Sequence, residues 1–433
     1  MRKYITFKAI LLIGAILFNN ICSSAGRAAL KGGVAKINIT PPIGIWLSGY
    51  GRRDKPSDDI VDELYAKALV LDDGQNTIAI VSADLVGIPL EITNQIRGIV
   101  KEKPGIPEKN VLICATHTHY GPMIRQRKIY DNLAVDKSYV QTLIKKTAGS
   151  VLIAYKNMKE VKIGAVKGQV PEIVYNRRTK MPDGSVRVTW GIPYNESEVT
   201  FGPTEPEVCV LRIEDMSGEI IGSLVNFACH PTSGSIFPDW LYSVSADFPG
   251  QTTRVVEQME GGICLFTQGT GGNMAAITRL HERKKPRLQM GNALGGEVLR
   301  RLQFISTSGD VTLKSLRKNI RFPTKKTLPD DSIMDDDKFK NDLTTEIQVF
   351  KVGDIYILGL PGEVLVEIGL EIKKRASIEN LFIISLSNDV CGYVCHSQAY
   401  EEGGYESTTA TILAKGAGEI MIKEALDLLN QIK

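Results

Sequence analysis

Residues 111–119, VLICATHTH, and residues 220–231, IIGSLVNFACHP, each join an apolar run to a histidine segment. Both apolar runs have the length and the β-branched content of a buried strand. His117 and His119 follow the first run and His230 follows the second, and these are three of the five histidines in the 433-residue chain. The end of a strand holds side chains at fixed distances where water can still enter. The pattern therefore predicts a sheet protein with a catalytic metal site at strand ends.

Further strands and helices alternate on both sides of these two stretches. Apolar and alternating runs predict strands at 34–39, 68–71, 77–81, 263–266, 311–316, 345–352, 355–358 and 381–386. Helical periodicity predicts helices over 90–101, 137–155, 251–259, 288–302, 364–374 and about 409–432. Pro182-Asp183-Gly184 is typical of a hairpin turn. We expect an α/β fold in which mixed β-sheets are flanked by helices.

The composition is that of an ordinary soluble globular protein. Hydrophobic residues make up 43% of the chain and charged residues 23%, which argues against a fibrous or largely disordered chain. Large sheet-based enzymes of this length often form one unit, and no low-complexity linker divides the sequence. We therefore expect one domain over residues 26–433.

The first 25 residues have the pattern of a signal peptide. Arg2 and Lys3 precede an apolar stretch over residues 9–18, and small residues follow at 23–26. The apolar stretch is too short for a permanent membrane anchor, and Asn19-Asn20-Ile21 before Cys22 is a poor context for lipid attachment. We expect export, to the periplasm or out of the cell. Removing three positive charges takes the formal net charge from +3 to about zero (+3 − 3), so nucleic acid is not an expected partner.

Neither the cysteines nor the acidic run near residue 335 is expected to form a disulfide framework or a metal site. Six cysteines follow residue 25, and their spacing is not that of a disulfide framework. The acidic run at residues 335–337 lacks the spaced ligands and glycine of a calcium loop, so we expect a solvated loop there.

The spacing of His117 and His119 bears on their roles. On an extended backbone, residues two apart point to the same face, so one can bind a metal while the other acts as an acid or base. Glu363 adds a carboxylate where a predicted strand meets a helix, although a glutamate in a first helical turn is also ordinary dipole compensation.

Short motifs along almost the whole chain give it a specific resemblance. In order, they are Ser48-Gly49-Tyr50-Gly51, Ala83-Asp84-Leu85, Thr116-His117-Thr118-His119, Asn176-Arg177, His230-Pro231-Thr232, Gln268-Gly269, Pro361-Gly362-Glu363, Gly392-Tyr393-Val394 and Tyr405-Glu406. In this order and spacing the chain resembles the neutral/alkaline, non-lysosomal ceramidase family, zinc amidases that cleave the N-acyl bond of ceramide. The resemblance implies that His117, His230, Glu363 and Tyr393 bind Zn²⁺.

The donor types agree with that implication. Imidazole and carboxylate are normal zinc ligands, and a catalytic site keeps a position open for water, whose pKa the metal lowers to about 7. A tyrosine ligand needs the metal or a neighbouring cation to favour its ionised form. For Tyr393, a core aromatic residue is the alternative interpretation.

The resemblance also implies roles for three further residues. His119 would carry protons, and Arg177 and Tyr405 would bind the substrate or the oxyanion that develops on the carbonyl. The alternatives are solvation at the surface for Arg177 and ordinary packing for Tyr405.

The chain departs from the family pattern in two ways. Residues 268–276 read QGTGGNMAA, which puts Ala275 where the family typically has a serine. The glycine-rich turn is expected either to direct backbone N–H groups to the site or to be a plain strand-to-helix turn. The chain also lacks room after Tyr405 for the C-terminal domain of longer members, so contacts made by that domain are in doubt.

Three functions follow as hypotheses. The first is zinc-dependent hydrolysis of ceramide or a related N-acyl lipid. Residues 237–242 and 43–47 would then form walls of an apolar groove, and ordinary core or loop packing is the alternative interpretation of these two segments. The second is a zinc hydrolase of the same fold acting on another amide or ester, such as an acylated amino sugar. The third is a non-catalytic binding protein. The expected partner is a small-molecule or lipid substrate, with peripheral membrane contact compatible with a lipid; the oligomeric state is left open.

Overall fold

A computed structural model describes residues 28–126, 133–181, 183–190, 202–234, 240–277, 285–328 and 342–433. The expected signal peptide at 1–25, residues 237–239 of the expected groove wall and the acidic run at 335–337 lie outside the described residues. No helix in the described ranges is both long enough and apolar enough to cross a membrane.

The larger sheet has eight strands in the order β13-β11-β10-β6-β1-β3-β4-β5. In chain order these are β1 (Lys31–Asn38), β3 (Tyr65–Asp72), β4 (Thr77–Ala83), β5 (Val111–Ala115), β6 (Lys159–Gln169), β10 (Glu207–Asp215), β11 (Ile220–Phe227) and β13 (Ile263–Gln268). Only two residue pairs of β1 and β6 join its halves. The halves meet again through side chains, since the Lys67 ammonium of β3 donates to the Cys264 carbonyl of β13 at 2.8 Å. β13 and β5, the first and last strands of the order, are also in contact, so the sheet curls until its two ends approach each other.

The second sheet has four strands in the order β15-β16-β17-β19. They are β15 (Leu313–Phe322), β16 (Leu343–Val352), β17 (Ile355–Gly359) and β19 (Leu381–Ile384). Side chains alternate across both sheets, as the period of a strand requires. In β5, Leu112 and Cys114 face the second sheet, where they share one core with Ile355 and Ile357 of β17, whereas Ile113 faces the helices.

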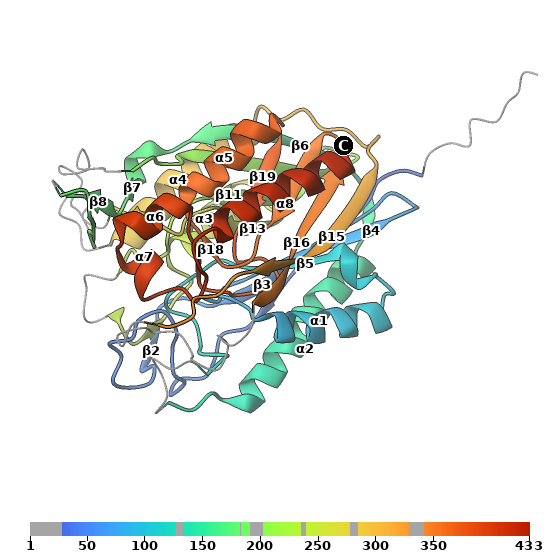
Figure 1. Ribbon diagram of the computed structural model, residues 1–433. Helices are drawn as coiled ribbons and strands as arrows, with labels where there is room; N and C mark the ends of the chain where they lie inside the picture. Colours follow the sequence, from blue (N-terminus) through green and yellow to red (C-terminus); the bar gives the residue numbers. More distant parts are fainter. Residues whose placement is uncertain are drawn as a thin grey trace, which may run out of the picture.

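Helices cover the outer faces of both sheets (Figure 1). The larger sheet is covered by α1 (Leu90–Glu102) and α2 (Lys137–Lys156) at one end and by α3 (Asp247–Glu260) and α4 (Pro286–Leu302) at the other. The smaller sheet is covered by α5 (Val366–Ala376) and α8 (Ala417–Ile432). The molecule is thus layered helix, sheet, sheet, helix, which confirms the expected α/β fold of mixed sheets flanked by helices.

The final helix begins later than predicted. The sequence predicts it from about residue 409, but Thr411 and Leu413 form isolated β-bridges with Gly392 and Thr324. Backbone groups used in these bridges are not available to a helix, so α8 begins only at Ala417. The hairpin prediction is confirmed, because β8 (Arg178–Lys180) pairs with β9 (Val186–Val188) on either side of the predicted turn.

Candidate metal centre

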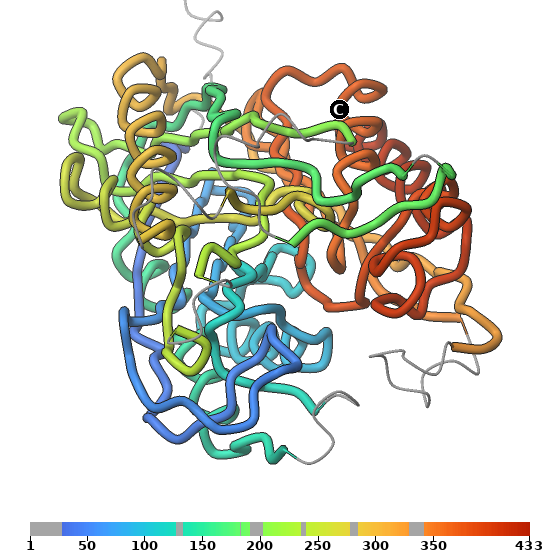
Figure 2. The backbone as a smooth tube through the Cα atoms, turned by 90° about the vertical axis from the view of Figure 1, so that its left-hand side faces the viewer, coloured from blue at the N-terminus to red at the C-terminus, as the bar shows by residue number. Residues whose placement is uncertain are grey.

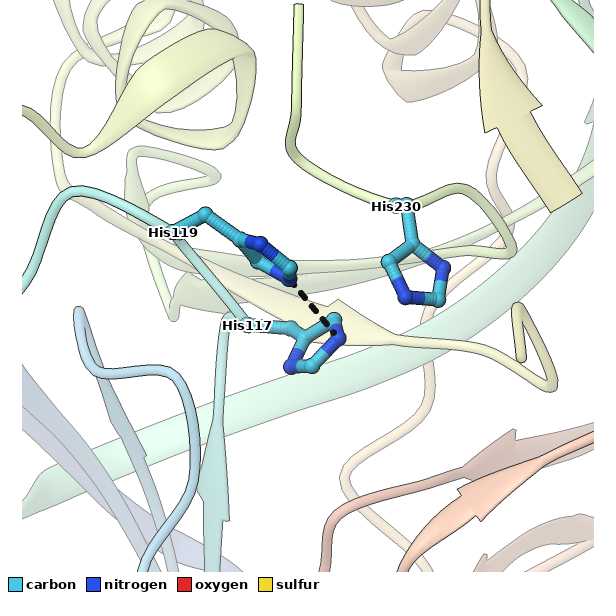
Figure 3. A group of neighbouring side chains, drawn as sticks. All are labelled: His117, His119 and His230. Carbon is cyan, nitrogen blue, oxygen red and sulfur yellow. Dashed lines mark hydrogen bonds between the residues drawn. The ribbon is translucent and has the colours of Figure 1, made fainter. Parts of the chain in front are cut away.

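The candidate site lies where four strands of the two sheets end. His117 and His230 follow β5 and β11, Glu363 begins β18 (Glu363–Val364) after β17, and Tyr393 begins β20 (Tyr393–Val394) after β19. Glu363 and Tyr393 are paired in parallel register. With His119, the two histidines form a group whose ligand atoms all lie within 4.8 Å of one another. Figure 3 shows the three rings pointing toward a common centre.

A loop after β19 connects the two sheets at this point. The Asn388 backbone N–H donates to the Ile113 carbonyl at 2.7 Å, and its side-chain oxygen accepts from the Ile113 N–H at 3.0 Å. On the other side, the Glu363 N–H donates to the Gly392 carbonyl at 2.9 Å. The same loop therefore holds the strand that leads to His117 and the segments that carry Glu363 and Tyr393.

Two backbone carbonyls orient the histidine rings. His117 Nδ1 lies 2.6 Å from the Val86 carbonyl, and His230 Nδ1 lies 2.7 Å from the Gly271 carbonyl. A carbonyl only accepts hydrogen bonds, so each Nδ1 carries the proton and each Nε2 keeps a free lone pair. This is the tautomer in which both Nε2 atoms can bind a metal ion.

The approach of His117 to His119 has a different cause from the one predicted. The two Nε2 atoms are 3.3 Å apart, but the backbone between them is not extended. β5 ends at Ala115, and His117 has a left-handed φ of 68°. The rings meet because the chain turns there, and the prediction of an extended strand through both histidines is wrong.

A carboxylate and a phenol complete the donor set. Glu363 Oε2 lies 3.3 Å from His117 Nε2 and 3.2 Å from His230 Nε2, and the Tyr393 hydroxyl lies 3.3 Å from His230 Nε2. Imidazole, carboxylate and phenol oxygen facing one point fit a divalent cation of the zinc class. The four predicted ligands are brought together, and their ligand roles stay a prediction.

Arg177 supplies a cation beside the phenol. Its Nη2 donates to the Tyr393 hydroxyl at 2.9 Å. Burial raises the pKa of Tyr393 well above its usual range, and the Arg177 guanidinium opposes that shift. Only 2% of Arg177 is exposed, so the alternative of surface solvation is wrong. Arg177 instead polarises the phenol from within the protein.

The partner of Arg177 is Glu406, a residue that the sequence did not single out as a site residue. Glu406 is fully buried and accepts from Arg177 Nε at 2.8 Å and from Arg178 Nη1 at 3.0 Å. It lies in α7 (Tyr405–Thr408), far along the chain from both arginines. In Figure 2 the green segment that holds β7 (Val174–Asn176) to β9 reaches across to the red segment that holds α6 (Ser397–Glu402) and α7.

Replacing Glu406 with alanine is expected to destabilise the fold by about 3–5 kcal/mol, because two buried guanidinium groups lose their shared counter-ion. Urea unfolding followed by circular dichroism measures the change. Glu401→Ala is the matched control, since Glu401 pairs with Lys415 at the surface with 57% of its side chain exposed and surface pairs contribute little. Equal urea midpoints for the two variants would contradict the buried-pair account.

His119 is held from several sides. Its carbonyl accepts from Arg53 Nη2 at 2.7 Å, and the Tyr50 ring lies edge-on at 5.2 Å between centroids. Its Nδ1 is buried without a hydrogen-bond partner among the described residues. Burial, followed by the nearby His117 and His230, holds the pKa of His119 well below its usual range. His119 is therefore a neutral base beside the group of donor atoms.

Tyr405 lies one ring further from the histidines. Its ring is 5.8 Å from that of Tyr393 and nearly perpendicular to it, at 74°. The residue is half-buried. The structure brings Tyr405 next to a candidate ligand, while its role in substrate binding stays a prediction.

The glycine-rich turn after β13 differs from both expectations. It leads into a short strand, β14 (Met274–Ala276), which pairs with β7 and contains Ala275. The N–H groups of Gly269, Gly271 and Gly272 donate within the fold. The turn offers the site carbonyls instead, that of Gly271 to His230 and that of Gly272 to Arg177.

Comparison with known families gives a match over most of this framework. The family described as "Neutral/alkaline non-lysosomal ceramidase, N-terminal" matches residues 31–279. The matched range includes His117, His119, Arg177 and His230, while Glu363 and Tyr393 lie beyond it.

Individual proteins are similar at low identity. Neutral ceramidase B of Dictyostelium discoideum is 24% identical over 271 residues, which cover 59% of this chain and 35% of that protein. Neutral ceramidase of Pseudomonas aeruginosa is 23% identical over 286 residues, which cover 62% of this chain and 40% of that protein. The matches thus span two fifths or less of the length of these relatives.

Solved structures show the same fold. A crystal structure of neutral ceramidase from Pseudomonas aeruginosa superposes with a TM-score of 0.78 at 18% identity, covering 94% of this chain and 74% of that one. A ceramidase complexed with C2 superposes with a TM-score of 0.75 at 17% identity, covering 94% and 75%.

Proposed function

The chain belongs to the neutral/alkaline non-lysosomal ceramidase family, and from that premise we propose that it hydrolyses the N-acyl amide bond of ceramide or a related N-acyl lipid with a bound zinc ion. One observation carries the proposal. The Nε2 atoms of His117 and His230 both lie within 3.3 Å of the same Glu363 carboxylate oxygen, with both Nδ1 protons directed to carbonyls. Rings fixed in this way are the usual partners of a catalytic zinc ion.

The proposed ligands are His117, His230, Glu363 and Tyr393. Two imidazole nitrogens, a carboxylate and a phenol polarised by Arg177 give a mixed nitrogen and oxygen set. When bound, a zinc ion supplies Lewis acidity and lowers the pKa of water to about 7.

His119 is the proposed proton carrier. Its low pKa leaves the ring neutral near pH 7, so it can accept a proton as water attacks the carbonyl carbon. The amine that departs from the broken C–N bond must be protonated, and the same ring can return the proton to it. The Nε2 atom of His119 faces His117 and is the atom assigned this step.

Arg177 and Tyr405 are proposed to orient the substrate carbonyl. Arg177 directs N–H groups toward the Tyr393 hydroxyl, and a fixed cation there favours negative charge developing on the carbonyl oxygen. Tyr405 packs on the outer side of Tyr393, where it can contact the group next to that carbonyl.

Gly49 gives a test of His119 that leaves the histidine itself unchanged. Gly49 has a φ of 105°, and a Cβ built there would lie 2.6 Å from Cβ and Cγ of His119. We expect Gly49→Ala to displace the ring and lower kcat/KM for N-acyl hydrolysis by about 100-fold. Gly44→Ala is the control, because Gly44 has a φ of 93° with nothing within 4 Å.

Both substitutions strain the backbone, by about 1 kcal/mol, and Gly49→Ala adds the cost of displacing His119. Only Gly49→Ala meets His119. If the two variants lost activity equally, displacement of His119 would not explain the loss.

A paired measurement tests the proposed function. Purified protein is analysed for bound zinc and incubated with N-acylsphingosine while released sphingosine is followed. Close to one zinc per chain together with sphingosine release is expected. Turnover only of an N-acylated amino sugar or an ester would favour the second function, for which Ala275 at the usual serine position is the motivation. If the purified protein held no zinc and turned over none of these substrates, the remaining hypothesis would be the non-catalytic binding protein.

A further inference from the structure

A row of aromatic rings leads from the histidines to the surface. The ring of His230 is stacked near that of Tyr393, with 6.3 Å between centroids, Tyr393 contacts Tyr405 at 5.8 Å, and Tyr405 contacts Trp190 at 5.6 Å. Exposure increases outward along this row. Tyr393 is 5% exposed, Tyr405 is half-buried and Trp190 is 61% exposed. An apolar strip therefore runs from the donor atoms into solvent.

Trp190 is fixed in place although it is exposed. The N–H of Thr189 donates to the Arg177 carbonyl at 2.8 Å, and the Tyr175 hydroxyl donates to the Thr189 carbonyl at 3.0 Å. The Arg177 guanidinium lies 4.8 Å from the Trp190 ring centroid, within the range of a cation–π contact. An indole that is held on one side and open to solvent on the other loses little further freedom when a ligand covers it.

The surroundings of Trp190 favour an apolar ligand. Among the described residues, the cation in contact with the Trp190 ring is Arg177, and it already donates to Glu406, Gly272 and Tyr393. The outer part of the row, Tyr405 and Trp190, presents aromatic ring surface to a ligand. Successive rings from Tyr393 outward lie at 74° to one another. An extended alkyl chain can follow such a strip and contact Tyr405 and Trp190 in succession.

We infer that Trp190 is a specificity-determining residue that binds the apolar acyl chain of the N-acyl substrate outside the site of bond cleavage. This inference rests on the proposed function. The ring contacts of Trp190 within the described part of the chain are with Tyr405 and Arg177 rather than with a candidate ligand, and Arg177 keeps its hydrogen bonds to Glu406, Gly272 and Tyr393 when the indole is removed. Longer acyl chains should therefore gain from Trp190, and short ones should not.

The kinetic test compares acyl chain lengths. Trp190→Ala is expected to lower kcat/KM about 10-fold for N-dodecanoyl- and N-hexadecanoylsphingosine, the effect of losing one well-packed aromatic contact. For N-acetylsphingosine the change should stay within about twofold, and Trp190→Phe should restore most of the loss. Phe304→Ala is the control, because Phe304 is 73% exposed and follows α4 rather than the aromatic row. Equal losses for all chain lengths would overturn the inference and leave Trp190 as a cover for the Arg177–Glu406 pair.

A binding measurement keeps the inference separate from the proposed function. Dodecanoate, a product of the proposed reaction, is titrated into wild type and Trp190→Phe while intrinsic tryptophan fluorescence is recorded. A shift to shorter wavelength in wild type that is absent in the variant supports an acyl-chain site even if no amide is cleaved. The same shift in both proteins, or none in wild type, overturns it. Selective loss of turnover of an N-acylated amino sugar, with no dependence on chain length, would also overturn it in favour of a sugar ring at Trp190.

Discussion

Replacing His230 with alanine should leave the protein without stoichiometric zinc and without measurable turnover. His230 is 1% exposed, and its Nε2 lies 3.2 Å from Glu363 and 3.3 Å from the Tyr393 hydroxyl. Loss of an outer partner of a metal ligand typically weakens metal binding by about 10- to 100-fold, so loss of a ligand itself should exceed the upper end of that range. Zinc analysis after dialysis and the rate of sphingosine release measure the two effects.

His396→Ala is the matched control for this substitution. His396 is a histidine away from the donor set, with 20% of its side chain exposed and its Nε2 3.8 Å from a Glu367 oxygen. We expect wild-type zinc content and near wild-type turnover. If His230→Ala kept one zinc per chain, the proposed donor set would be wrong. If it lost zinc but kept turnover, zinc would not be part of the reaction.

The strand ends that hold the site could be predicted because the signal is local. An apolar run followed by a histidine is visible in nine residues, and β5 and β11 lie on the apolar runs of the two quoted stretches. β10 is not among the predicted strands, although residues 208–211 form an uninterrupted apolar run. β6 is not among them because charged residues interrupt its apolar positions. Half-buried strands of this kind owe their state to pairing with neighbours, and pairing is not a local property.

Other parts of the site depend on contacts between distant segments. Glu406 stands in one of the motifs of the resemblance, but nothing local in the sequence shows that it is buried, which depends on Arg177 and Arg178 lying opposite. The left-handed φ of His117 likewise belongs to a turn in which its N–H donates to the Leu85 carbonyl, a contact with a distant segment. A spacing of two residues gave the right proximity for the wrong geometric reason.

The arrangement also explains how residues so far apart in sequence reach one point. His117 and His230 follow strands near opposite ends of the eight-strand order, and the curl of that sheet closes the distance. The separate β18–β20 pair, whose strands follow β17 and β19 of the second sheet, then adds two ligand candidates, Glu363 and Tyr393. Each sheet alone carries half of the donor set, so the centre exists only where the two layers are packed together.

His119→Ala should separate proton transfer from metal binding. The ligand atoms of His117, His119 and His230 lie close enough for all three to hold one ion, which leaves a three-histidine centre as the competing interpretation. The environment of His119 differs from that of the other two, because its Nδ1 has no carbonyl partner among the described residues while theirs are fixed by Val86 and Gly271. Metal-ligating histidines almost always donate their other ring N–H to an acceptor, so the absence of such an acceptor at Nδ1 within the described ranges favours proton transfer over metal binding as the role of His119. We therefore expect the variant to keep about one zinc per chain while kcat falls by about 10²- to 10⁴-fold, the usual contribution of a positioned acid or base. Zinc loss comparable to that of His230→Ala would assign His119 to the metal instead, and the proton carrier would then have to be sought among other residues.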